Sequence, residues 1–162
     1  MKGYGELGLI QNKKFPYMAA IVACKGDHAC SYGCKGCGNC IEVCKFDAIH
    51  INDNGVAFVD EDKCIACGMC VRACPQNIIH IHDCANYIVV KCSNHDKGVE
   101  ARKQCDVSCI GCGICERTCT AEAISVKNYC AEIDEKYCLS CGMCLIKCPR
   151  HVINDTLGIL RR

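Results

Sequence analysis

A cysteine motif that occurs four times along the chain limits what the chain can fold into. Each copy reads C-x2-C-G-x-C-x3-C and is followed by a short apolar stretch. The copies begin at Cys34, Cys64, Cys109 and Cys138. The first copy maps onto the third at an offset of 75 residues and the second onto the fourth at an offset of 74, so the pair is itself repeated. We therefore predict two tandem modules with two motifs each.

Composition narrows what these cysteines can bind. The chain has 162 residues with 22 cysteines, no Trp and only three Phe, so an aromatic core is thin. Such a chain folds around disulfides, zinc or iron–sulfur clusters. Structural zinc usually takes two C-x2-C pairs separated by a dozen or more residues, and four uninterrupted runs of four cysteines do not match that spacing. Iron–sulfur clusters therefore fit best.

The N-terminal sequence favours a reducing compartment. Its first 24 residues show no charged segment followed by a long apolar one, and the apolar run Met18–Cys24 is too short to span a bilayer. We therefore expect a soluble cytoplasmic protein, in which thiols stay reduced and disulfides are disfavoured.

The repeated motif is typical of bacterial two-cluster ferredoxins. In these, three closely spaced cysteines hold one [4Fe–4S] cluster and the fourth reaches the neighbouring cluster. We therefore expect four [4Fe–4S] clusters with crosswise ligands. Cluster one takes Cys34, Cys37, Cys40 and Cys74, and cluster two takes Cys64, Cys67, Cys70 and Cys44. Cluster three takes Cys109, Cys112, Cys115 and Cys148, and cluster four takes Cys138, Cys141, Cys144 and Cys119.

Six cysteines remain outside these sets: Cys24, Cys30, Cys84, Cys92, Cys105 and Cys130. Cys30 and Cys105 each lie four residues before the first ligand of a module, so they are either alternative ligands or buried thiols packed against the cluster loop. We expect the other four to be small core residues. A fifth cluster from Cys24, Cys30, Cys84 and Cys92 is possible in number, but that spacing resembles no known site.

The first motif leaves one ligand position open between two cysteines. Because Cys74 supplies the fourth ligand of cluster one, Cys30, Cys34, Cys37 and Cys40 compete for three positions. The glycine that follows Cys37 matches the other three motifs, and this spacing favours Cys37 over Cys30.

The fold expected from these patterns is α+β, with two bacterial-type 2[4Fe–4S] ferredoxin-like modules. Apolar residues alternate on both sides of a turn in 48–64 and again in 123–138, so each module should contain a β-hairpin. His80 and His82 share one face of a strand and should be exposed edge residues. The expected boundaries are a tail at 1–23 that docks a partner, module one at 24–82, a connector at 83–104, module two at 105–155 and a tail at 156–162. Within the connector, 86–92 should form a strand and 96–105 a short helix.

The segments "ACSYGCKGCGNCIEVCKFDAIHI", "VDEDKCIACGMCVRACPQNIIHI", "YIVVKCSNHDKGVEARKQCDVSCIGCGICERTC" and "AEIDEKYCLSCGMCLIKCP" closely resemble the polyferredoxin region of the B subunit of the Rnf complex. This complex is a membrane-associated ferredoxin:NAD oxidoreductase of anaerobic bacteria. The likeness covers about residues 24–155 and implies electron transfer through several clusters.

Two departures from that family matter. The Rnf B subunit starts with a transmembrane anchor and a further cysteine-rich cluster domain, and we expect neither here, so the resemblance does not imply ion pumping or membrane anchorage. In the family, an apolar residue commonly stands at the position of Cys37 and a cysteine is usual at the position of Cys30. The resemblance therefore favours Cys30 as a ligand where local spacing favours Cys37.

We expect a non-catalytic electron-transfer subunit, because no Gly-rich phosphate loop, flavin motif or nucleophile–base arrangement is present. The expected partners are a catalytic subunit of the aldehyde or formate oxidoreductase, hydrogenase or flavin-based bifurcating type, together with a carrier such as ferredoxin. The alternative is a freely diffusing polyferredoxin. A free carrier would need a strongly acidic docking face, which the formal charge of +1 does not favour. Nucleic-acid binding and a membrane span are not indicated.

Overall fold

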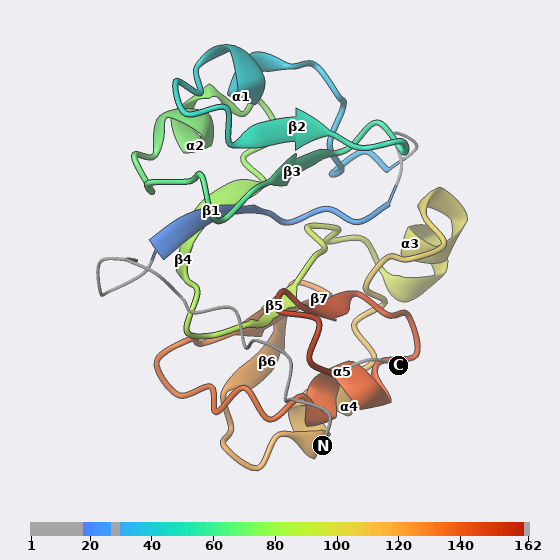
Figure 1. Ribbon diagram of the computed structural model, residues 1–162. Coiled ribbons are helices and arrows are strands. Elements are labelled where there is room, and N and C mark those ends of the chain that lie inside the picture. The colour runs from blue at the N-terminus through green and yellow to red at the C-terminus, as the bar shows by residue number, and fades with distance from the viewer. Residues whose placement is uncertain (1–17, 27–29, 161–162) are drawn as a thin grey trace, which may run out of the picture.

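The computed structural model describes residues 18–26 and 30–160. Within them, five short helices and eight strands form four separate two-stranded antiparallel sheets (Figure 1). In the part of the chain so described, no helix is both long and apolar enough to cross a membrane.

The first half of the described chain nests one strand pair inside another. Its elements are β1 (Met18–Val22), α1 (Asn39–Glu42), β2 (Ile49–Ile51), β3 (Ala57–Val59), α2 (Met69–Ala73) and β4 (Ile79–Asp83). The inner strands β2 and β3 pair as a hairpin, with Ile49 opposite Val59. The outer strands β1 and β4 pair with each other, with Met18 opposite Asp83.

The second half repeats this order and adds one helix. Its elements are β5 (Ile88–Val90), α3 (Gly98–Gln104), α4 (Ile114–Thr118), β6 (Ile124–Lys127), β7 (Cys130–Ile133), α5 (Met143–Lys147) and β8 (Ile153–Asp155). The inner pair is β6 with β7 and the outer pair is β5 with β8. The extra helix is α3, which begins in the segment where the sequence predicts a short helix.

Both hairpins predicted from alternating apolar residues are confirmed, and local turn chemistry explains them. In the first turn, the Asn52 side-chain oxygen accepts hydrogen bonds from the amides of Asn54 and Val56, each at 3.0 Å. In the second turn, Asn128 and Tyr129 both adopt positive φ angles of 46° and 65°. Two consecutive residues in this conformation match the twist of the flanking strands.

The outer strands β1 and β5 lie outside the module boundaries that we expect from the sequence. β1 lies in the segment 1–23 that we expected to be a tail, yet it pairs with β4 along its whole length. β5 lies in the expected connector 83–104 and pairs with β8. Each outer strand is far from its partner in sequence, so no local pattern reveals the pairing. The expected partner-docking role of 1–23 falls mostly on residues 1–17, which lie outside the described residues.

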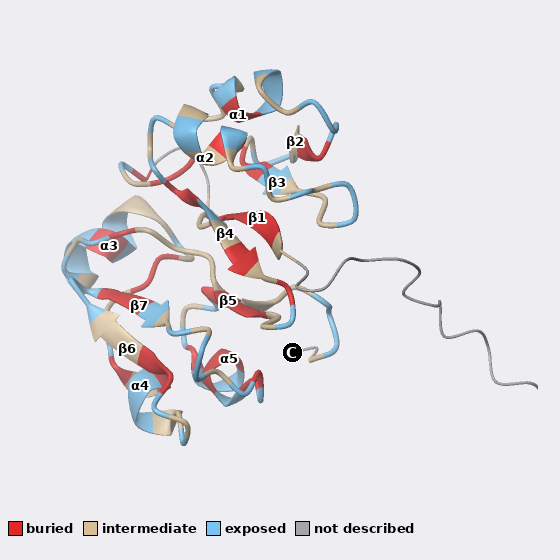
Figure 2. Cartoon of the chain, turned by 90° about the vertical axis from the view of Figure 1, so that its left-hand side faces the viewer, coloured by how far each residue is buried: buried red, intermediate tan, exposed pale blue. Residues whose placement is uncertain are grey.

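Each half has its own core, and cysteines are part of both cores. Ile49 and Ile79 pack in the first core with buried cysteines of two motifs, and Ile124 and Ile153 do so in the second. In Figure 2 the buried residues of the two halves lie on the strands and on the inner faces of the short helices. The segment 156–162, expected to be a tail, contributes Leu160 to the second core.

Strand β1 should contribute to stability as a structural strand. Ile21 is 4% exposed and lies opposite His80 in β4. We expect Ile21→Ala to cost about 2–5 kcal/mol, because it leaves a cavity under a paired strand. Val99→Ala is the control, since Val99 is 68% exposed and should change stability by less than about 0.5 kcal/mol. The measurement is the urea concentration at which the anaerobically purified protein loses its visible cluster absorbance. Equal midpoints for the two variants would contradict a structural role for β1.

Candidate iron–sulfur cluster sites

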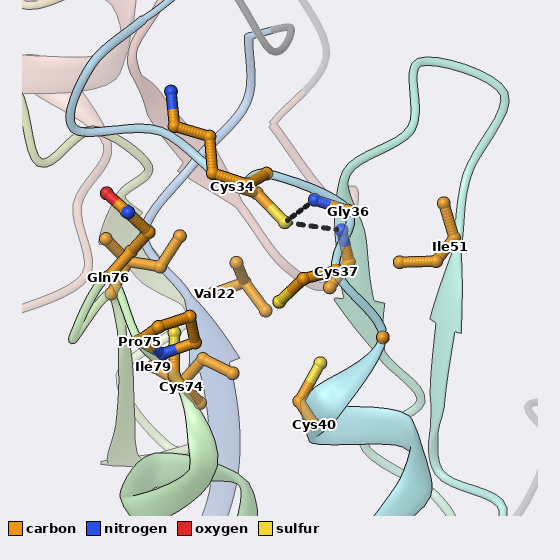
Figure 3. A pocket seen from close by; sticks show the side chains of 14 residues that line it. Val22, Cys34, Gly36, Cys37, Cys40, Ile51, Cys74, Pro75, Gln76 and Ile79 are labelled. Carbon is orange, nitrogen blue, oxygen red and sulfur yellow. Dashed lines mark hydrogen bonds between the residues drawn. The ribbon is translucent and has the colours of Figure 1, made fainter.

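Four pockets of about 320–360 Å³ each bring four cysteines together. The first is lined by Cys34, Cys37, Cys40 and Cys74 (Figure 3). The second is lined by Cys44, Cys64, Cys67 and Cys70, the third by Cys109, Cys112, Cys115 and Cys148, and the fourth by Cys119, Cys138, Cys141 and Cys144. These are the four sets that crosswise spacing groups as ligands. In each pocket, three cysteines come from one motif and the fourth from its partner motif.

The backbone explains how the fourth cysteine leaves its own motif. A short helix begins after the glycine of each motif, and these glycines have φ angles of 69° to 82° that a side chain would disfavour. In three motifs the helix ends directly before the fourth cysteine, which turns into an extended conformation. These cysteines are Cys74, Cys119 and Cys148, with ψ angles of 114°, 107° and 115°. The extended turn directs the chain toward the neighbouring pocket.

Backbone amides donate hydrogen bonds to the first cysteine of the motifs. The amide two residues later is the donor in three of them, from Gly36 to Cys34, from Ala66 to Cys64 and from Ser140 to Cys138, each at 3.4 Å. A second amide comes from a strand, since Ala57 donates to Cys34 at 3.4 Å and Ala20 donates to Cys64 at 3.3 Å. Such bonds favour the thiolate and, on a cluster, stabilise the added electron.

The third cysteine of each motif is buried on its helix, where an isolated thiolate is unfavourable. Burial raises the pKa of Cys40 and of Cys115 to about 11 and that of Cys144 to about 12. Charge repulsion from other cysteines of the same pocket adds to this. A cation at the centre of the pocket removes both penalties. The donor set, four thiols around one small hollow, therefore fits a [4Fe–4S] cluster.

The second cysteine of each motif faces solvent. Cys37, Cys67, Cys112 and Cys141 are all exposed, whereas the third cysteines are buried. Each pocket is thus closed on its helix side and open at the second cysteine. A cluster held there would lie near the surface, which suits electron exchange with another protein.

Cys130 contacts two other cysteines, a relation that the sequence alone did not reveal. Its thiol donates a hydrogen bond to the Cys92 carbonyl oxygen at 3.3 Å, and side-chain hydrogen bonding with Cys130 lowers the pKa of Cys109 and that of Cys92. The pKa of Cys130 itself is raised by the same bonds, so Cys130 keeps its proton. Cys130 corresponds to Val56 in the first hairpin at the offset of 74, and this departure from the repeat is the signal that could have identified it.

The two histidines of β4 differ from each other. His80 is exposed, as expected, but His82 is fully buried, so the expectation of an exposed edge residue is wrong for it. The His82 Nε2 atom lies 3.8 Å from the Glu61 Oε1 atom and 3.8 Å from the Cys84 Sγ atom. Strand alternation failed here because Glu61 and Cys84 lie beside His82 on a face of β4 that is open at His80.

Comparison with protein families identifies the cysteine motifs as cluster-binding domains. Residues 33–78 match a 4Fe-4S dicluster domain, residues 63–123 match a second 4Fe-4S dicluster domain and residues 135–151 match a 4Fe-4S binding domain. The chain thus binds [4Fe–4S] clusters.

Curated relatives cover most of this chain. The B subunit of the Na(+)-translocating ferredoxin:NAD(+) oxidoreductase complex of Acetobacterium woodii is 46% identical over 135 residues, or 83% of this chain and 40% of the relative. The B subunit of the ion-translocating oxidoreductase complex of Methanosarcina acetivorans is 38% identical over 83% of this chain and 51% of the relative. The B subunit of the proton-translocating ferredoxin:NAD(+) oxidoreductase complex of Clostridium ljungdahlii is 46% identical over 79% of this chain and 46% of the relative. The chain spans about half the length of these relatives or less.

A solved structure is also similar at a low level. The formate dehydrogenase–heterodisulfide reductase–formylmethanofuran dehydrogenase complex from Methanospirillum hungatei matches with 22% identity over 76% of this chain and 52% of that chain, with a TM-score of 0.30. A TM-score this low carries no argument about fold or function.

Removing the Cys130 thiol should lower the reduction potential of the cluster at Cys109. A hydrogen bond to a ligand sulfur stabilises the reduced cluster, so Cys130→Ala should shift its midpoint downward by on the order of tens of millivolts. Cys130→Ser keeps a donor and should shift it less. Cys84→Ala removes a buried thiol that lines none of the four pockets and should shift nothing. The measurement is a redox titration followed by electron paramagnetic resonance, and unchanged midpoints in Cys130→Ala would rule out the tuning role.

Proposed function

We propose that this chain, a homologue of the ferredoxin region of Rnf-complex B subunits, conducts single electrons as a non-catalytic subunit of such a complex. The observation that carries this proposal is the set of four pockets, each lined by four cysteines drawn crosswise from two motifs. The three long relatives are all B subunits of ion-translocating complexes. These relatives correct the expectation of an aldehyde or formate oxidoreductase, a hydrogenase or a bifurcating enzyme as the host complex.

The two halves act as tandem ferredoxin modules with two clusters each. Support comes from the repeated order of elements and from the nested strand pairs in both halves. The ligands are the four pocket sets, with Cys37 rather than Cys30 on cluster one, because Cys37 lines that pocket and Cys30 does not. Each loaded pocket adds a charge of about −2, so four clusters take the formal charge from +1 to about −7.

Electrons enter and leave where the clusters approach the surface. Beside the exposed second cysteines, Ile65 is 57% exposed next to the pocket of cluster two and Leu139 is 74% exposed next to that of cluster four. Apolar side chains at the mouth of a cluster pocket suit transient contact with a partner protein. The partners are a redox carrier such as ferredoxin and the other subunits of the complex, in the cytoplasm.

The ligand assignment is tested by counting iron in single variants. Cys37→Ala should lower the iron and sulfide content of the anaerobically purified protein, because cluster one loses a ligand on the open side of its pocket. Cys84→Ala is the matched control, since Cys84 is buried but lines none of the four pockets, and it should keep the full content. Full iron content in Cys37→Ala would refute the assignment of Cys37.

The choice between a complex-bound and a freely diffusing protein is tested by the size of the native protein. Anaerobic extracts of the native source are separated by size exclusion, and the chain is followed by mass spectrometry. A complex-bound chain elutes with partner proteins at a mass far above 17.7 kDa. Elution alone near 17.7 kDa would instead favour the freely diffusing polyferredoxin.

A further inference from the structure

A fifth pocket brings together four of the six cysteines left over from the motifs. It has a volume of about 280 Å³ and is lined by Cys24, Cys30, Cys92 and Cys105. The two halves meet here, because Cys24 and Cys30 belong to the first and Cys92 and Cys105 to the second. The set expected from sequence as a numerical possibility contained Cys84 in place of Cys105. Cys84 lies instead beside His82.

The four cysteines occupy equivalent positions in the two halves. Cys24 is the second residue after β1, and Cys92 is the second residue after β5, the corresponding outer strand. Cys30 and Cys105 each lie four residues before the first motif cysteine of their half. Each half thus contributes one cysteine from behind its outer strand and one from before its first motif. A chance gathering of buried thiols would not follow the internal repeat in this way.

Hydrogen bonds to these sulfurs repeat those of the four motif pockets. The amide of Asn94 donates to the Cys92 sulfur two residues earlier at 3.5 Å, and the amide of Gly26 bonds to the Cys24 sulfur in the same relation. The Asn94 side chain, which is fully buried, donates from its Nδ2 atom to the Cys30 sulfur at 3.4 Å. Buried donors directed at sulfur are the surroundings that a cluster ligand requires.

Two further amides connect this pocket to its neighbours. The Cys34 amide donates to the Cys24 sulfur at 3.4 Å, and the Cys109 amide donates to the Cys92 sulfur at 3.2 Å. Cys34 and Cys109 are the first cysteines of the pockets of clusters one and three. The fifth pocket is therefore bonded symmetrically to one cluster pocket in each half.

The charges around the pocket suit an anionic centre. Lys25 and Lys91 line it, and no Asp or Glu is among its lining residues. The Arg150 guanidinium donates to the Cys105 carbonyl oxygen at 3.0 Å and so adds a third cation beside it. Four thiolates around a [4Fe–4S] core carry a net charge of about −2, which these cations offset.

The separation of the sulfurs distinguishes a cluster from a single metal ion. Zinc–sulfur bonds of about 2.3 Å place the four sulfurs of a mononuclear site about 4 Å apart. Among described residues, three ligand atoms lie within 4.8 Å of one another only in Glu61, His82 and Cys84. In none of the five cysteine-lined pockets, therefore, do three described sulfurs lie as close together as a single zinc ion requires. A cubane, which binds each cysteine at a separate iron corner, needs that wider spread.

We propose that Cys24, Cys30, Cys92 and Cys105 hold a fifth [4Fe–4S] cluster at the junction of the two halves. Its conducting role rests on the proposed function: one electron passes from a reduced cluster in one half to the oxidised fifth cluster, and then to an oxidised cluster in the other half. Each transfer oxidises the donor cluster by one electron and reduces the acceptor by one. The binding of the cluster itself does not depend on that role.

The first test is the metal content of the unmodified, anaerobically purified chain. Five cubanes give about twenty irons and twenty sulfides per chain, with less than one zinc, whereas four give about sixteen irons. Iron and zinc are measured by plasma mass spectrometry and sulfide by colorimetry. About sixteen irons would overturn the proposal, whether or not one zinc accompanies them.

The second test removes one ligand from each half. The double variant Cys24→Ala/Cys105→Ala should lose about four irons and four sulfides relative to the unmodified chain, and Cys84→Ala should lose none. If the double variant Cys24→Ala/Cys105→Ala does not fold, a second pair of variants provides an independent test. Cys30→Ala and Cys37→Ala should lower iron content independently, and their combination should sum the two losses. A combined loss no greater than the larger single loss would mean that Cys30 and Cys37 do not serve separate clusters, which would overturn the fifth site.

The conducting role has a separate readout. In Cys24→Ala/Cys105→Ala, the clusters of both halves stay bound, so loss of the junction cluster should slow the exchange of electrons between the halves at least several-fold. The exchange is followed by rapid-freeze electron paramagnetic resonance after a pulse of dithionite that reduces only part of the clusters. Unchanged rates with four irons lost would refute the role but keep the site. An unmodified chain that binds five clusters but exchanges no electrons with any acceptor would refute the proposed function instead.

Discussion

Mutual repulsion among buried thiolates is the constraint on which this structure depends. Each pocket confines four cysteines, and burial together with neighbouring thiolates raises the pKa of the helix cysteines Cys40, Cys115 and Cys144. Four cysteine thiolates can line one pocket only when cations, such as the irons of a cluster, lie between them. The two cores are small and consist in part of these same cysteines. Binding free energy of the clusters is therefore also folding free energy, as in other small metal-bearing domains.

The crosswise arrangement of cysteines in the pockets couples the motifs within each half. The helix of one motif ends at a cysteine that lines the pocket of the other, so neither pocket is complete without both motifs. The outer strand pairs β1–β4 and β5–β8 then close each half around its two pockets. The halves in turn meet at four cysteines that follow the same internal repeat, Cys24 with Cys92 and Cys30 with Cys105.

Sequence spacing was sufficient for the parts of the structure that are local. The motif cysteines, the glycines before the helices and the two hairpins all follow from patterns within about 20 residues, and the structure groups the cysteines as that spacing does. The pairing of β1 with β4 could not be predicted, because about 60 residues separate the partners and neither carries a distinctive pattern. Cys105 was expected to be either an alternative ligand or a buried thiol, and its place beside Cys24 and Cys30 could not be predicted because those two cysteines lie in the other half. The burial of His82 was missed because alternation along a strand does not reveal that one position of its outer face is covered by residues distant in sequence, such as Glu61.

The long sequence separation between cysteines of one pocket bears on how the protein is made. Cys40 and Cys74 line the same pocket, so under the proposed ligand assignment the first cluster is fully ligated only after the ribosome has synthesised residue 74. Under the same assignment, the proposed junction cluster requires Cys105 and the third cluster requires Cys148. Synthesis from the N-terminus thus imposes an order on maturation, with the first half competent to take its clusters while the second is still incomplete. Until Cys148 is made, the exposed thiols of the second half depend on the reducing conditions of the cell to stay available for iron.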